Sequence, residues 1–218
     1  MSSYGADIQG SLGASSDNVF RGVSLSRGQP SLLADLNGVG TRWFGGLSVD
    51  TLRLAPGSSV QPQLIGYLGY QQPLSTDWSG TWSLRHYDYP TDAYRSRYDY
   101  QELSANLGWR DQVQLQLIGS PDTYAVASGH RYGRGAAWAA QLNGEVPLPR
   151  TLSGQLGIGY EDLRRQVGGG YVYWSAGLSA QWTGWTFALA YIGTDAEGRR
   201  LFGARAGDRL VGSVVWSF

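Results

Sequence analysis

Few side chains in this sequence could perform acid–base or nucleophilic chemistry. The chain has two histidines, His86 and His130, and no cysteine. A histidine beside a serine can act as the general base of a hydrolase, and the run Ser128-Gly129-His130 brings these two residue types together. No carboxylate at an obvious spacing completes a triad, and His86 has the same strand parity as Leu84. We therefore expect a protein that is not an enzyme, with a hydrolase that uses His130 as an alternative.

Other chemical signatures are missing from the sequence. No phosphate-binding loop, metal-ligand cluster or calcium loop is apparent, so we expect no metal and no cofactor. The net charge is zero and no dense basic run occurs, which argues against nucleic-acid binding.

Charged and amide side chains at alternate positions form a second chemical signal. Acids and arginines are mixed among them, so the pattern indicates no preference for anions or cations. Facing a water-filled passage, such groups could select solutes by charge and size; paired with one another, they would brace a wall. Both alternatives remain open. The residues expected to line the interior are Asp7, Asp35, Arg42, Asp50, Arg85, Glu102, Arg110, Gln114, Gln141, Glu145, Gln155, Glu161, Tyr171, Tyr173 and Arg209.

These positions belong to segments in which apolar and polar residues alternate with period two, the pattern of a β-strand with one apolar face. The alternation predicts twelve strands. The count becomes ten if one of the two weakest segments, near 113–118 or 31–36, is not a strand. The predicted strands cover residues 7–14, 32–37, 42–50, 63–71, 78–85, 102–110, 112–117, 138–145, 152–161, 171–181, 185–191 and 208–218.

The apolar face of these strands is unlike a soluble core. It carries all nine tryptophans, whereas the other face is Ser, Gln, Asn, Gly and charge. A soluble β-sandwich or a lipocalin-like barrel would bury the apolar face, but the polar face here could not form a dry core. Trp and Tyr collect at membrane interfaces. The pattern therefore predicts an all-β protein, a transmembrane antiparallel up-and-down β-barrel with its apolar face toward lipid.

The connections between strands favour a closed barrel that forms a single domain over residues 1–218. An even number of strands places both termini at the rim with short periplasmic turns, and the last strand can pair with the first to leave no open edge. The short turns are expected at 38–41, 72–75, 109–112, 147–150 and 183–184, and the longer extracellular loops at 16–28, 53–59, 88–97, 120–134, 162–168 and 194–206.

The terminal strand ends on aromatic residues at alternate positions, Trp216 and Phe218. This ending resembles the signal by which bacterial outer-membrane barrels are recognised for assembly, and it implies the barrel-assembly machinery as a partner. We expect a monomer in the outer membrane of a Gram-negative bacterium, with its signal peptide removed.

Outer-membrane lipids are the second expected partner. Arginines in the predicted loops could pair with lipopolysaccharide phosphates, for which the guanidinium has suitable bidentate geometry; equally, they could form ion pairs with loop carboxylates. These arginines are Arg21, Arg27, Arg95, Arg97, Arg131, Arg134, Arg164, Arg165, Arg199, Arg200 and Arg205.

The most distinctive motif away from the C-terminus lies in the first long loop. It reads Phe20-Arg21-Gly22-Val23-Ser24, followed by Gly28-Gln29-Pro30 and later by Gly45-Gly46-Leu47-Ser48-Val49. About the first 55 residues resemble the TorF-like family of porins, proteobacterial outer-membrane proteins. The resemblance implies an outer-membrane barrel with a pore function and carries over no site residues. Independently, Arg21 and Ser24 at the head of this loop could fold it inward as a partial plug.

Together these observations predict a channel for passive diffusion of small hydrophilic solutes. Two alternatives come from other classes of protein: an outer-membrane hydrolase that modifies lipid or lipopolysaccharide, and a plugged barrel with a structural or surface-interaction role.

Overall fold

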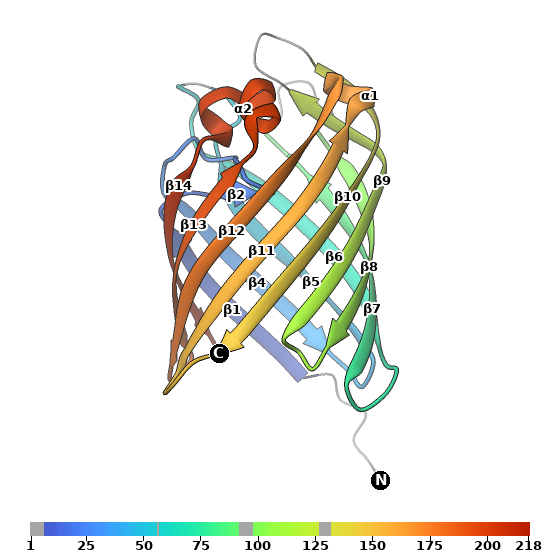
Figure 1. The fold of residues 1–218 in the computed structure, drawn as a ribbon, viewed down its shortest axis with the longest axis vertical. Helices are drawn as coiled ribbons and strands as arrows, with labels where there is room; N and C mark the ends of the chain where they lie inside the picture. Colours follow the sequence, from blue (N-terminus) through green and yellow to red (C-terminus); the bar gives the residue numbers. More distant parts are fainter. Residues whose placement is uncertain (1–6, 56, 92–97, 127–131) are drawn as a thin grey trace.

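The computed structural model describes residues 7–55, 57–91, 98–126 and 132–218, which form a closed antiparallel barrel (Figure 1). Twelve strands make the wall, so the predicted fold class is confirmed. They are β1 (Asp7–Ser15), β4 (Ser31–Val39), β5 (Trp43–Leu52), β6 (Gln61–Pro73), β7 (Trp78–Asp88), β8 (Tyr100–Trp109), β9 (Val113–Val126), β10 (Tyr132–Pro147), β11 (Leu152–Leu163), β12 (Gly169–Trp182), β13 (Trp185–Thr194) and β14 (Arg209–Ser217).

Tight turns join the strands at the rim where β1 begins and β14 ends. Thr183 and Gly184 connect β12 to β13 with φ angles of 43° and 79°, and Arg110 and Asp111 take φ angles of 50° and 55° between β8 and β9. Two central residues with positive φ produce the turn twist that matches the right-handed twist of paired strands. These turns hold neighbouring strands in antiparallel register.

The barrel closes where β14 pairs with β1. Ser217 lies opposite Ser11, and the backbone of Phe218 exchanges two hydrogen bonds with Gly10, each 2.9 Å. A Cβ at Gly10 would lie 2.7 Å from the Phe218 ring, so the glycine leaves the space that the terminal ring fills. Trp216 stands next to it, with ring centroids 4.7 Å apart. The C-terminal aromatics therefore seal the seam from its outer side.

The outer surface of the wall is apolar. Leu47 and Trp182 are each 70% exposed, and every barrel strand carries further exposed aliphatic or aromatic side chains. No tryptophan belongs to a buried cluster among the described residues. Such a continuous apolar face is unfavourable in water and suits hydrocarbon, where the closed backbone ladder satisfies every strand.

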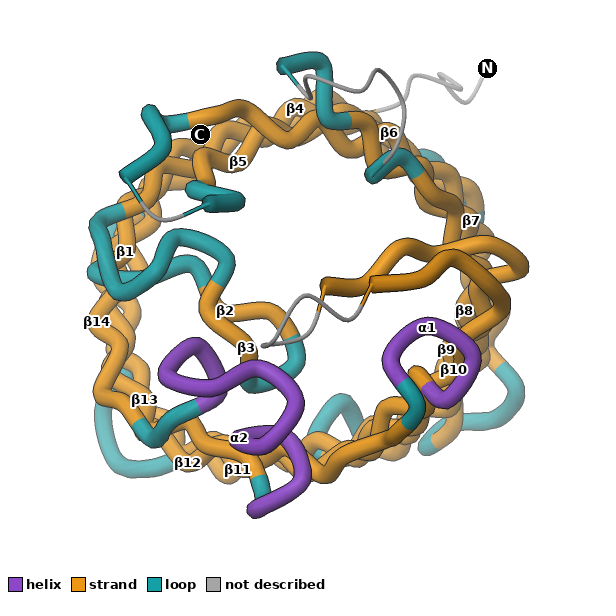
Figure 2. Tube along the Cα trace, turned by 90° about the horizontal axis from the view of Figure 1, so that it is seen from above, coloured by secondary structure: helices purple, strands orange, loops and turns teal. Residues whose placement is uncertain are grey.

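Three short helical elements lie at the other end of the barrel, where long loops were predicted (Figures 1 and 2). They are α1 (Arg164–Val167), α2 (Ala196–Phe202) and the 3₁₀ helix η1 (Gly203–Ala206). None of the helices that the structure describes is long and apolar enough to cross a membrane.

One predicted loop is wrong in extent. Residues 120–134 were expected to form a loop, but β9 continues to Val126 and β10 begins at Tyr132. The pairing is interrupted by a register shift between Gly135 and Ala137. This bulge and the polar composition obscure the alternation that marks the rest of the strand pair.

The first long connection, residues 16–30, folds into the barrel instead of outward. Its hairpin, β2 (Val19–Phe20) and β3 (Val23–Ser24), lies inside the ring of strands when viewed from the loop end (Figure 2). With α1, α2 and η1 it builds a small apolar core there, so the expectation that the interior would contain no dry core is wrong for this end. The buried cluster is Val23, Leu163, Val167, Tyr171, Tyr173, Leu201, Phe202 and Ala206.

Candidate functional site

The tip of the inward hairpin is a two-residue turn. Arg21 and Gly22 have φ angles of 48° and 79°, the combination of a type I′ hairpin turn. A Cβ at Gly22 would lie 2.6 Å from Cγ2 of Thr194 and 2.9 Å from Cβ of Tyr173. Glycine is thus required both by the backbone angle and by the close approach of the tip to the barrel wall.

Arg21 at this tip bridges two carboxylates of the wall. Its Nη2 donates to Oε1 of Glu102 on β8 at 2.7 Å, and its Nη1 donates to Oε1 of Glu161 on β11 at 2.8 Å. The three side chains are only 8%, 6% and 9% exposed. Burial opposes the charge of Arg21, but the two glutamates outweigh it and hold the pKa of the guanidinium well above its ordinary value.

The remaining oxygens of the two glutamates are also satisfied. Oη of Tyr171 donates to Oε2 of Glu161 at 2.7 Å, and Oη of Tyr87 donates to Oε2 of Glu102 at 3.2 Å. The Arg21 guanidinium lies over the Phe20 ring, 4.4 Å from its centroid. A buried ion pair is better tolerated when the remaining carboxylate oxygens also have partners, as those of both glutamates do here. The loop tip is therefore held to β8 and β11 by buried ion pairs and hydrogen bonds.

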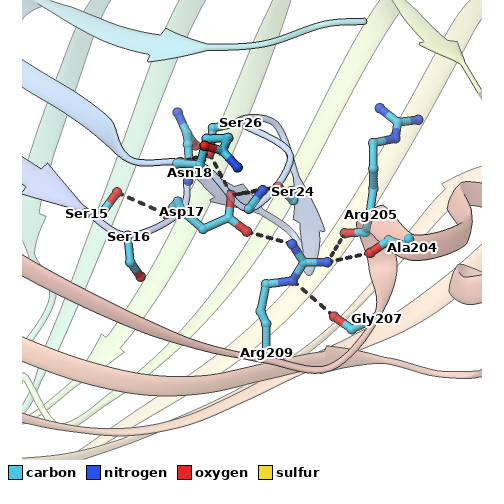
Figure 3. Close-up of polar contacts among 12 residues, drawn as sticks. Ser15, Ser16, Asp17, Asn18, Ser24, Ser26, Ala204, Arg205, Gly207 and Arg209 are labelled. Carbon is cyan, nitrogen blue, oxygen red and sulfur yellow. Dashed lines mark hydrogen bonds and ion pairs between the residues drawn. The ribbon is translucent and has the colours of Figure 1, made fainter. Parts of the chain in front are cut away.

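The base of the same loop has a second anchor at Asp17 (Figure 3). Its Oδ1 accepts hydrogen bonds from Oγ of Ser24 and Oγ of Ser26, both at 2.6 Å. Its Oδ2 accepts from Nη1 of Arg209 at 2.6 Å. One carboxylate thus joins the two arms of the loop to the last strand of the barrel.

Arg209 extends this anchor to η1. Besides Asp17, its guanidinium donates to the carbonyls of Ala204, Arg205 and Gly207 at 2.8, 2.7 and 3.0 Å (Figure 3). Charge-assisted bonds of this kind are about twice as strong as neutral ones. The loops before β14 and after β1 consequently form one connected unit at the loop end.

Three cavities follow one another along the inside of the wall, and the inward loop borders the first two. A cavity of about 350 Å³ at the loop end and one of about 140 Å³ in the middle share Phe20, Arg21 and Glu102. The middle cavity reaches Gln116 and Gln141, which pair in the sheet. The next inward pair, Gln114 and Asn143, borders a third cavity of about 260 Å³ toward the turns.

Most predicted interior residues lie on the inner face. Asp35 accepts from Oη of Tyr67 at 2.9 Å, and Oη of Tyr173 donates to Gln141 at 2.9 Å. Arg85 borders the middle cavity. The others with inward strand parity are Asp7, Asp50, Glu102, Gln114, Glu145, Gln155, Glu161, Tyr171 and Arg209.

Arg42 and Arg110 do not line the lumen, contrary to prediction. Arg42 donates to Oη of Tyr70 at 3.1 Å. The Tyr70 ring packs against Trp43 on the outer face, with ring centroids 4.8 Å apart. Arg110 lies over the Trp109 ring at 4.9 Å and pairs with Asp77 at 3.0 Å. Both arginines belong to turns, where strand alternation no longer determines the direction of a side chain.

The described residues provide no arrangement of side chains that supports the hydrolase alternative. Ser128 and His130 lie outside the described residues, as do Arg95, Arg97 and Arg131. His86 lies on the outer face of β7 and is exposed.

Several of the remaining loop arginines form ion pairs within the loops. Arg164 pairs with Asp162, Arg200 with Glu197, and Arg199 with Asp208 at 3.4 Å. Arg21, placed in the same set by its sequence position, points into the lumen.

Two residues of this site were missed by the sequence analysis. Asp17 was not among the predicted site residues, and no local pattern shows that it meets Arg209. Gly22 could have been recognised from the sequence. It is the second of two residues between the residue pairs that begin with Val19 and Val23, and glycine at that place is typical of a two-residue hairpin turn.

Comparisons with known proteins agree with this architecture. The model of a family described as "Bacterial protein of unknown function (Gcw_chp)" matches residues 2–218; it does not confirm the TorF-like assignment. No curated protein matches the sequence significantly.

Solved structures share the fold at low identity. The NanC porin has a TM-score of 0.61 at 10% identity, covering 97% of this chain and 99% of that one. The KdgM porin in complex with disordered oligogalacturonate has a TM-score of 0.59 at 9% identity, with the same coverages of 97% and 99%. Salmonella typhi OmpF in complex with daunomycin has a TM-score of 0.50 at 10% identity, covering 98% and 97%. The chain is therefore similar in fold to porins.

Proposed function

We propose that this chain, which belongs to the Gcw_chp family of bacterial proteins of unknown function, is an outer-membrane channel for small hydrophilic solutes whose bore is set by its inward first loop. The observation that carries this proposal is the succession of three cavities along the inside of the wall, two of which that loop borders. A barrel of twelve strands is wider than the eight-stranded type that its own side chains can fill, and here the space is only partly occupied.

The smallest of these three cavities is where selection would occur. Its polar border includes Arg21, Arg85 and Glu102, with amides from Gln116 and Gln141. Because one acid and two arginines face the same small volume, passage depends on size and on the arrangement of hydrogen-bonding groups as much as on net charge. Passive diffusion of small polar solutes fits this lining.

The outer surface of the barrel suggests what the protein would contact in the membrane. The apolar outer face would contact outer-membrane lipid, and the loop end, with its exposed arginines, would face lipopolysaccharide. Trp216 and Phe218, exposed on the outer face at the seam, are the proposed contact for the barrel-assembly machinery. We propose a monomer, because the barrel closes on itself with no unpaired edge.

A sealed structural barrel is the second candidate, and one observation favours it. The buried Arg21–Glu102–Glu161 network joins the inward loop to β8 and β11 and braces the wall. If the side chains around this network do not move, the loop-end cavity and the middle cavity would remain separate and no solute would pass between them.

Conductance across a planar bilayer separates the two candidates. Protein refolded in detergent is inserted into the bilayer in concentrated KCl. The channel proposal expects small discrete steps for the wild type, and severalfold larger steps for Arg21→Ala, in which the loop tip is released. Arg200→Ala, which removes an arginine from the exposed face of α2, should conduct like the wild type. Correctly folded wild type without any steps would overturn the channel in favour of the sealed barrel.

A further inference from the structure

The structure changes the balance of charge that the sequence predicted for the lumen. Of the arginines expected inside, Arg42 and Arg110 belong to turns and do not line it. Arg209 donates to Asp17 at 2.6 Å, so a carboxylate already balances its charge. Arg85 borders the middle cavity and forms no ion pair in the part of the chain that the structure describes. It is the inward strand arginine whose charge remains.

The charge of Arg21 is more than balanced. Its guanidinium contacts Glu102 at 2.7 Å and Glu161 at 2.8 Å, so one cation stands between two carboxylates. Arg85 lies opposite Glu102 in the pairing of β7 with β8, so a carboxylate also neighbours the remaining arginine. The middle of the lumen is therefore not positive, although two arginines border the middle cavity.

A further carboxylate is fixed beside this group. Arg85 is also paired in the sheet with Tyr67, whose hydroxyl donates to Oδ2 of Asp35 at 2.9 Å. Asn37 donates to Oδ1 of Asp35 at 2.7 Å. A Cβ at Gly46 would lie 2.7 Å from the Tyr67 hydroxyl, so this glycine leaves the space through which the tyrosine reaches Asp35. Both donors are neutral, so they hold the carboxylate in place without cancelling its charge.

Other carboxylates with inward parity also have no cation. Asp50 on β5, Asp7 at the start of β1 and Glu145 beside the third cavity form no ion pair among the described residues. The strands β9 and β10 line the same lumen with neutral amides such as Gln114 and Gln141. Inward acids without an ion pair therefore outnumber inward arginines without one along the described wall.

Uncompensated charge decides which ions enter a water-filled passage. Low-dielectric walls focus the field of fixed charges and raise the local concentration of the opposite ion, and acidic side chains around a pore select cations. Paired groups such as Arg21 and its glutamates contribute little to this preference beyond their net charge. The preference depends mainly on Asp35 and the other unpaired acids, opposed by Arg85.

We propose that the lumen prefers cations, and that the barrel admits small amine-bearing solutes over carboxylate-bearing solutes of similar size. Asp35 and Arg85 are the residues that set this preference from opposite directions. The proposal rests on the channel function proposed above and adds to it the charge class of the solutes.

The reversal potential of the refolded protein in a planar bilayer with a KCl gradient tests the preference. K⁺ should permeate severalfold better than Cl⁻ through the wild type in dilute KCl, and this ratio should fall as the salt is raised, because salt screens the fixed charges. Asp35→Asn keeps an acceptor for the Tyr67 hydroxyl and should lower the ratio, whereas Arg85→Gln should raise it.

Asp111→Asn is the matched control. It makes the same charge change as Asp35→Asn, but at the tip of the turn between β8 and β9, where asparagine tolerates the φ angle of 55°. It should leave the permeability ratio unchanged. Heat-modifiable gel mobility verifies the fold of each variant.

Uptake by proteoliposomes extends the test to organic solutes. The probes are N-methylglucamine, sorbitol and gluconate, which are a cation, a neutral molecule and an anion built on similar six-carbon polyol chains. N-methylglucamine should enter fastest and gluconate slowest, and Asp35→Asn should narrow the difference.

The outcomes separate this proposal from the channel function. Discrete steps with equal permeabilities or a preference for Cl⁻ overturn the cation preference alone, as does uptake of gluconate as fast as that of N-methylglucamine. A ratio that folded Asp35→Asn and Arg85→Gln both leave unchanged overturns the role of these residues. The absence of any step in correctly folded wild type overturns the channel and its preference together.

Discussion

The two ends of the lumen are built differently. At the loop end, polar side chains are buried and paired: Arg21, Glu102 and Glu161 are each less than a tenth exposed, and Tyr171 is 1% exposed. At the turn end, inward residues such as Gln114 and Glu145 are exposed. The same strands run through both ends.

The difference shows that the wall alone does not determine the bore. Along the strands, alternation places polar groups inward at both ends. In the part of the chain that the structure describes, the loop end receives an additional segment, residues 16–30, whose own charges complement those of the wall. Complementarity in a low-dielectric space turns polar side chains into fixed structure, whereas the same residue types at the turn end remain solvated.

The largest expected effect comes from removing the central charge of the loop end. Arg21→Ala leaves two glutamates buried without their cation, which should cost about 3–5 kcal/mol of unfolding free energy. Urea unfolding in lipid vesicles, followed by tryptophan fluorescence, measures the loss.

The triple substitution Arg21→Met, Glu102→Gln and Glu161→Gln is the matched control. It removes all three charges but keeps similar volumes, and it should lie near the wild type because no charge is left unpaired. Equal losses for the single and triple variants would contradict the view that charge complementarity holds the loop.

An intermediate effect is expected at the second anchor. Asp17→Asn removes the charge that faces Arg209 and disturbs the acceptor of Ser24 and Ser26, a local loss of about 1.5–3 kcal/mol. Hydrogen exchange should report it, since the Leu25 amide, bonded to the Asn18 carbonyl at 2.7 Å, would exchange faster while strand amides keep their protection.

Asp208→Asn provides the comparison for that anchor. Asp208 pairs with Arg199 near the surface at 3.4 Å, with both side chains more than 40% exposed, so its loss should change exchange by at most ~1 kcal/mol. If Asp17→Asn leaves Leu25 as protected as in the wild type, the Asp17 cluster does not fix the loop.

The smallest effect is expected at the turn end. Glu145→Gln should change stability by no more than about 0.5 kcal/mol, because an exposed side chain without a fixed partner contributes little. In a conducting barrel it should shift the reversal potential in a salt gradient slightly toward anions, since one negative charge leaves the lumen. A stability loss as large as that of Arg21→Ala would remove the distinction between the two ends.

Local pattern was enough to predict the wall. Twelve strands with their inward and outward faces were predicted from period-two alternation, and the pairing of the last strand with the first from the even strand number and the alternating short and long connections. The prediction failed where that pattern stops: at Arg42 and Arg110, which lie in turns, and at residues 120–134, where a bulge interrupts the ladder. Parity gives a direction only while the chain is an unbroken strand.

The amino-acid sequence by itself determined which face of each strand is apolar, because that depends on residues two positions apart. It also determined that the last strand can pair with the first, because that depends on an even number of strands. The inward turn of the first loop was already a hypothesis from Arg21 and Ser24, but tertiary structure decided that Arg21 meets Glu102 and Glu161, which are 81 and 140 positions away. Ion pairs at such separations depend on the curvature of the closed wall, which brings β8 and β11 to the same side of the lumen, and no local pattern contains that distance.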